Sequence, residues 1–132
     1  MEAFRAHNFK VGFYHSVIDW HHPEFPVDGL HPMRENLAFR EAAKNRDIAK
    51  YRTYLHGQTR AADPIWAHRH YVVRLLVCGS RLGLVQGQRA EDWDSARLMQ
   101  MVRELHPNIL VNDRLGIGGD LKTPEQYQPA GK

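Results

Sequence analysis

The residues best suited to binding chemistry lie between Trp20 and Pro32, in the segment WHHPEFPVDGLHP. Its prolines exclude a helix or a ladder strand. It follows Lys10–Val17, a short apolar and aromatic run typical of a strand covered on both faces. A loop of this composition at the end of a buried strand is where α/β proteins place binding chemistry. Aromatic, proline-rich loops also form small cores of their own, so both interpretations stay open.

The nine histidines raise the question of a metal site. His21 and His22 are adjacent in a proline-rich loop, which is not the spacing of zinc ligands. The single cysteine, Cys78, leaves no second thiol for a metal cluster or an internal disulfide. We therefore predict neither a metal nor any other cofactor.

Composition places the chain among ordinary globular domains. It has 132 residues, of which 42% are hydrophobic and 25% charged, enough for one domain with a core. The 18 lysines and arginines against 15 acidic residues are scattered along the chain, which disfavours nucleic-acid binding. No run reaches membrane-spanning length and no apolar leader opens the chain, so we predict no membrane association. The compartment stays open, because the sequence begins as if in the middle of a pattern.

Apolar spacing predicts an alternation of strands and helices. The expected elements are a helix tail over 1–9 with Phe4 inward, a strand over 10–17, a surface helical turn within 34–45, an amphipathic helix over 46–58, a possible strand over 71–78, a helix over 95–106 and a strand over 109–113. Asp94 is the expected N-cap of the helix from Ser95, and Pro107 ends it. Strands separated by helices favour an α/β fold with a parallel sheet.

Several motifs resemble one family. Four stretches carry the resemblance: FYHSVIDWHHPEFPVD, MRENLAFREAAKNRDIAKYRTYLHGQ, WDSARLMQMVRELHPNILVNDRLG and GDLKTPEQY. They are similar to the middle of the catalytic domain of α-L-fucosidases, glycoside hydrolase family twenty-nine. Within them, VNDRLG followed by TPEQY is fairly specific to the family. The resemblance covers 1–58 and 90–130. It implies an incomplete (β/α)8-like barrel over 1–132, with parallel strands and crossover helices, and a fucosylated glycan or glycoside as substrate. It also implies a retaining mechanism, which needs two carboxyl groups about 5–5.5 Å apart.

The resemblance implies roles for three residues. Tyr14 matches a tyrosine that lines the sugar pocket at the end of a strand, and Arg114 matches the arginine that follows the VND strand. Glu125, in TPEQ, matches the candidate general acid/base. Structural interpretations remain beside these: a tyrosine that packs in the core, a solvated arginine, and a glutamate that caps a short helix.

Residues 59–89 depart from the family pattern. There the family has a buried strand that ends in Trp-x-Asp, whose aspartate is the nucleophile, whereas in this chain no aspartate follows the apolar run over 71–78. Arg74 lies inside that run, and a lone buried charge is costly. The resemblance therefore predicts a chain that lacks the nucleophile and has no fucosidase activity.

A shifted reading frame would account for this departure. When each codon from Thr59 onward is read one nucleotide later, the overlaps permit RELLTQYGPIDIMWYDFSY, which resembles the missing helix end and nucleophile strand. The aspartate codon would span Arg74 and Leu75, and the ordinary frame matches the family again from Ala90.

Other interpretations remain. The chain could be a non-catalytic carbohydrate-binding remnant, a fragment that depends on a partner, or a small α/β enzyme of unrelated chemistry. An open piece of a barrel would expose strand edges, which predicts self-association.

Overall fold

The structure is a computed structural model of the chain. It describes residues 2–9, 11–61, 71–76 and 89–122. In chain order the elements are α1 (Glu2–Ala6), β1 (Val11–Ser16), α2 (Leu37–Ala42), α3 (Ile48–Ala61), β2 (Tyr71–Leu76), α5 (Ala90–Trp93), α6 (Ser95–Leu105), β3 (Leu110–Val111) and the 3-10 helix η1 (Asp113–Leu115). In this part of the chain no helix is long and apolar enough to span a membrane.

The strands form one parallel sheet in the order β1-β2-β3. β2 pairs along its whole length with β1, Tyr71 opposite Val11 and Leu76 opposite Ser16. The prediction that the strands near 10–17 and 109–113 are parallel members of one sheet is confirmed. The apolar run that begins at Tyr71 forms the strand between them, so the chain has an α/β fold.

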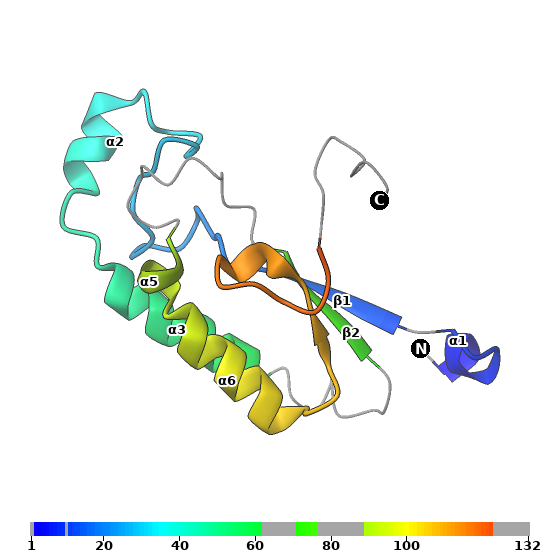
Figure 1. Cartoon of the computed structure of the whole chain (residues 1–132). Helices are drawn as coiled ribbons and strands as arrows, with labels where there is room; N and C mark the ends of the chain where they lie inside the picture. The colour runs from blue at the N-terminus through cyan, green and yellow to red at the C-terminus, as the bar shows by residue number, and fades with distance from the viewer. Residues whose placement is uncertain (1, 10, 62–70, 77–88, 123–132) are drawn as a thin grey trace, which may run out of the picture.

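The two long helices, α3 and α6, lie side by side on one side of the sheet (Figure 1). Their buried side chains meet those of β3 and of the loop after β1 in one core. The fully buried members with less than 2% exposure are Val17, Phe25, Tyr51, Leu55, Trp93, Leu98, Val102, Val111 and Leu115. Burial of this apolar surface on one face of the sheet is what fixes the helices there.

The start of α6 follows the predicted capping pattern. The Asp94 carboxylate accepts a hydrogen bond from the backbone N–H of Arg97 at 3.4 Å, and Asp94 takes the left-handed conformation that aspartate tolerates. Helical spacing predicts a buried stripe of Leu98, Met99, Val102 and Leu105, and the structure confirms it at Leu98 and Val102, while Met99 and Leu105 are half-buried. The stripe did not include Met101, which is 4% exposed because α6 also packs against α3.

Three sequence expectations were wrong in detail. Phe4 was expected to face inward but is 61% exposed. Its ring packs edge-on against that of Phe9, with the ring centroids 6.3 Å apart. β1 was expected to be covered on both faces, yet Tyr14 is 61% exposed. The strand predicted over 109–113 is shorter, because the backbone turns into η1 at Asp113.

Candidate functional site

Two of the three predicted site residues, Tyr14 and Arg114, lie toward the carboxyl end of the sheet. Tyr14 lies near the end of β1 and pairs in register with Arg74 of β2. Arg114 lies in η1, which directly follows β3 and contacts β2. Because all three strands are parallel, Tyr14 and Arg114 belong to the same end of the sheet, on the two sides of β2.

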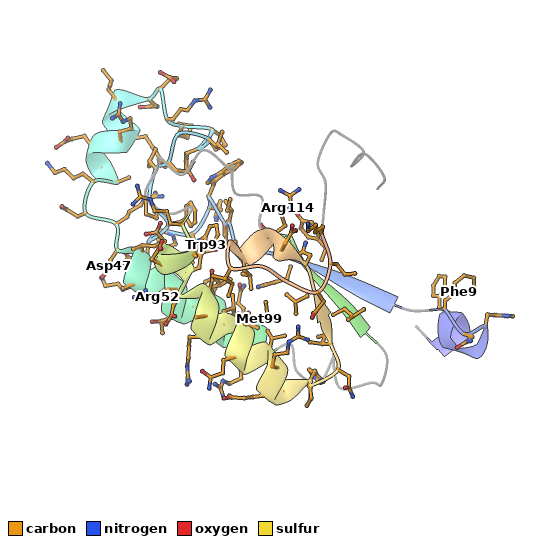
Figure 2. The ribbon with its side chains drawn as sticks, viewed as in Figure 1. Phe9, Asp47, Arg52, Trp93, Met99 and Arg114 are labelled. Carbon is orange, nitrogen blue, oxygen red and sulfur yellow. The ribbon has the colours of Figure 1, made fainter. Side chains whose placement is uncertain are left out.

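Arg114 is held on a short, well-anchored turn. The next residue, Leu115, is fully buried in the core, and Gly116 ends the turn with a φ of 76°, a conformation that suits glycine. Figure 2 shows Arg114 on the side of η1 that faces away from α6. Arg114 is partly exposed, although its Nε and Nη2 atoms are buried. A guanidinium carries several N–H donors in one plane, which suits sugar hydroxyls or an anion.

The third predicted residue, Glu125, lies outside the described residues, as do 62–70 and 77–88 of the departing segment. The structure therefore brings Tyr14 and Arg114 to one end of the sheet and leaves the placement of Glu125 a prediction. Its chain position is four residues after Leu121, which bridges to Asn112.

The loop after β1 is organised by its own polar side chains. Asp28, which is 2% exposed, accepts hydrogen bonds from the Trp20 indole at 3.3 Å and from the backbone of Leu30 at 2.8 Å. His31, also 2% exposed, accepts from the backbone N–H of Met33 through Nδ1 and therefore donates from Nε2 to the Trp20 carbonyl oxygen. Both ring nitrogens of His31 thus hold the loop together.

The aromatic residues of this loop pack onto α3. Phe25 is fully buried and meets Tyr51 edge-on at 4.8 Å, while the His22 ring lies 4.4 Å from that of Tyr54. His22 Nδ1 accepts from the backbone N–H of Glu24 at 3.1 Å. These contacts favour the interpretation of the loop as a small core of its own. In the described ranges, no group of three or more His, Cys, Asp or Glu residues is placed to hold a metal ion.

Two further contacts tie the loop to the start of α3. The Glu24 carboxylate accepts from the backbone N–H of Asp47 at 2.9 Å and from Lys50 at 3.3 Å, and both hydrogen bonds lower the pKa of Glu24. The Arg46 guanidinium donates to the Phe25 carbonyl oxygen at 2.8 Å. The loop is therefore fixed in place relative to the start of α3.

His15, beside Tyr14, is a residue that the sequence did not single out. Its Nε2 is buried and makes no hydrogen bond to the residues that the structure describes. Burial lowers the pKa of His15, because the charged ring would lose its hydration. Alternation along β1 was the available signal, since it places His15 and Tyr14 on opposite faces of the sheet.

This lowered pKa predicts a pH dependence of stability. The folded state favours the neutral ring, so its contribution is complete above the ordinary histidine pKa of 6.5 and is lost as the pH falls through the lower folded-state pKa. We expect the free energy of unfolding to fall between pH 7 and pH 5, and to fall less in His15→Gln. Urea titrations at both pH values measure this difference. His7→Gln, at an exposed position, is the control; equal losses in His15→Gln and the parent would contradict the prediction.

Comparisons with known proteins fit this arrangement. The sequence pattern of the family described as Alpha-L-fucosidase matches residues 1–132, a range that includes 59–89. Among solved structures, the chain is similar to α-L-fucosidase isoenzyme 1 from Paenibacillus thiaminolyticus, with 36% sequence identity and a TM-score of 0.80. The match covers 97% of this chain and 31% of that chain, so this chain spans about a third of that structure. A comparison with curated proteins gave no match.

Proposed function

We propose, because the chain belongs to the α-L-fucosidase family, that it forms part of a (β/α)8-like barrel of a retaining glycoside hydrolase acting on terminal α-L-fucose. The observation that carries this proposal is the parallel sheet with Tyr14 and Arg114 at its carboxyl end. In barrels of this kind, active sites lie at that end of the strands. Tyr14 and Arg114 would bind the sugar, and Glu125 would be the general acid/base.

The place that a displaced reading frame would give the nucleophile is consistent with the same proposal. The displaced reading frame places the aspartate codon across Arg74 and Leu75, and these residues pair with Tyr14 and His15 of β1. An aspartate there would lie in the strand between Tyr14 and η1, at the carboxyl end of the sheet. The carboxylate would attack the anomeric carbon as the glycosidic bond breaks, with Glu125 protonating the departing oxygen and Arg114 holding a sugar oxygen. Water, activated by Glu125 as a base, would then release the fucose from the enzyme.

The test of this function uses a catalytic domain in which residues 59–89 are restored to the displaced frame and the remainder of the family domain is supplied. We expect hydrolysis of an aryl α-L-fucoside with retention of configuration. Glu125→Gln should lower the rate by about 10²–10⁴-fold, the usual contribution of a general acid. A restored domain without fucosidase activity would overturn the proposed function. A restored domain whose activity is unchanged in Glu125→Gln would overturn the role of Glu125.

The encoding DNA gives a separate prediction about the departing segment. We expect a one-nucleotide offset that enters near Gln58 or Thr59 and is cancelled near Arg89, with the displaced frame open throughout. Sequencing of the gene measures this directly. A stop codon in the displaced frame, or overlaps that encode residues unlike the family strand, would contradict the prediction.

A second function is favoured by the sequence of β2 as it stands. This strand carries Arg74 and contains no carboxylate, so the chain could bind a fucosylated glycan without cleaving it or could depend on a partner. Fucose binding without turnover, in a gene whose ordinary frame is continuous, would favour this alternative.

A further inference from the structure

The segment Gly119–Leu121, which we term the staple, pairs with the end of β3. The backbone N–H of Asp120 donates to the Val111 carbonyl oxygen at 2.7 Å, and that of Leu121 donates to the same oxygen at 3.3 Å. The backbone N–H of Asp113 donates to the Leu121 carbonyl oxygen at 2.9 Å. The staple therefore holds both sides of Asn112, immediately before η1.

Gly119 allows this close approach. A Cβ at this position would lie 2.7 Å from the Val111 carbonyl oxygen and closer still to that of Asn112. These are backbone atoms in the sheet and its exit, so they cannot move aside as the end of a flexible side chain can. Any residue larger than glycine at position 119 would push the staple away from β3.

The Asp120 side chain joins the staple to α6. Its Oδ2 atom accepts from the backbone N–H of Val111 at 2.8 Å and also forms an ion pair with Arg103. Arg103 in turn donates to the carbonyl oxygen of Ile109, the residue before β3. The Val111 N–H and then the Arg103 guanidinium lower the pKa of Asp120, so the carboxylate stays charged and keeps both contacts at neutral pH.

These contacts bear on the candidate site because Arg114 follows Asp113 directly. Leu115 anchors one end of η1 in the core, and the staple fixes the other end through Asp113. We propose that Gly119 and Asp120 are positioning residues that set the place of the Arg114 guanidinium for sugar binding. This inference rests on the proposed function for its ligand, and on the hydrogen bonds at Val111 and Asp113 for its geometry.

Two kinds of measurement test the staple in the full 132-residue chain. The variants are Gly119→Ala, Asp120→Ala and Asp120→Asn, and the control is Val102→Ala, which removes fully buried methyl groups from α6 without touching the staple. Amide hydrogen exchange should become about tenfold or more faster at Asp113 in Gly119→Ala and Asp120→Ala, but not in the control. Asp120→Asn should keep most of the protection, because its amide oxygen can still accept from Val111.

Binding of an aryl α-L-fucoside supplies the second measurement, made well below the melting temperature of every variant. We expect Gly119→Ala and Asp120→Ala to bind about tenfold more weakly than the control, and Asp120→Asn to recover most of the affinity. The proposal would be overturned if the Asp113 amide exchanged at an unchanged rate in Gly119→Ala and Asp120→Ala. It would also be overturned if these variants lost protection at Asp113 but bound the fucoside as tightly as the control.

The two proposals fail in distinguishable ways. The proposed function fails if the restored domain does not hydrolyse the fucoside, and the second function fails if the parent chain does not bind it, whatever the exchange data show. In that case the Asp113 amide decides the staple by itself: faster exchange confined to the staple variants supports the positioning of η1, and unchanged exchange overturns it.

Discussion

The 132-residue chain should not hydrolyse an aryl α-L-fucoside at an enzymatic rate. In a retaining mechanism the nucleophile forms the bond to the sugar, so its absence removes the covalent route. General acid catalysis by Glu125 alone would contribute about 10²–10⁴-fold, against the roughly 10⁶-fold or greater enhancement typical of enzymes. β2 also places Arg74 opposite Tyr14, in the strand where a carboxylate would be needed.

The assay compares three proteins on the same substrate: the chain itself, the chain restored over 59–89, and the restored full domain. We expect turnover only from the full domain. Substantial turnover by the unrestored chain that Glu125→Ala abolishes would contradict the prediction. It would mean that another carboxylate, such as Asp63 or Asp113, acts as the nucleophile.

The largest single effect on stability is expected at Tyr51. This residue is 1% exposed, its ring packs on Phe25, and its hydroxyl donates to the Val17 carbonyl oxygen at 2.8 Å. Tyr51→Ala should lower the free energy of unfolding by about 3–5 kcal/mol, the usual cost of removing a buried aromatic ring. Tyr51→Phe keeps the ring but leaves the buried Val17 carbonyl without its donor, so we expect a loss of about 1–3 kcal/mol. Urea denaturation followed by circular dichroism measures both.

Tyr54 provides the matched control, because it is the same residue type on the same helix and is 39% exposed. Tyr54→Ala should cost less than half as much as Tyr51→Ala. Equal losses for the two variants would show that α3 is not fixed by the contact between Tyr51 and the loop after β1.

The arrangement of strands and helices could be predicted because it depends on local patterns. The apolar run before Ser16, the helical spacing of Tyr51 and Leu55, and the Asp94 cap each indicate an element without reference to the rest of the chain. The end of β3 could not be predicted in this way. It is decided by Asp120 and Leu121, which lie about ten residues further along and pair with Val111 through the backbone.

The candidate site divides in the same manner. Tyr14 and Arg114 were found through motifs that resemble the family, and their places at the end of the sheet follow from the parallel strands. Gly119, Asp120 and His15 lie within motifs that resemble the family, but the resemblance assigned no role to any of them. Their importance lies in close backbone approach, in an ion pair to Arg103 and in burial, which only the three-dimensional arrangement brings together.

The occupied backbone groups of Val111 also limit how copies of this chain could assemble. Its N–H and carbonyl oxygen on the side away from β2 are taken by Asp120 and Leu121, whereas β1, among the described residues, pairs only with β2. A strand from another copy would therefore have to displace existing hydrogen bonds at Val111, whereas along β1 the described residues offer no such competitor. We expect any self-association of this chain by strand addition to begin beside β1.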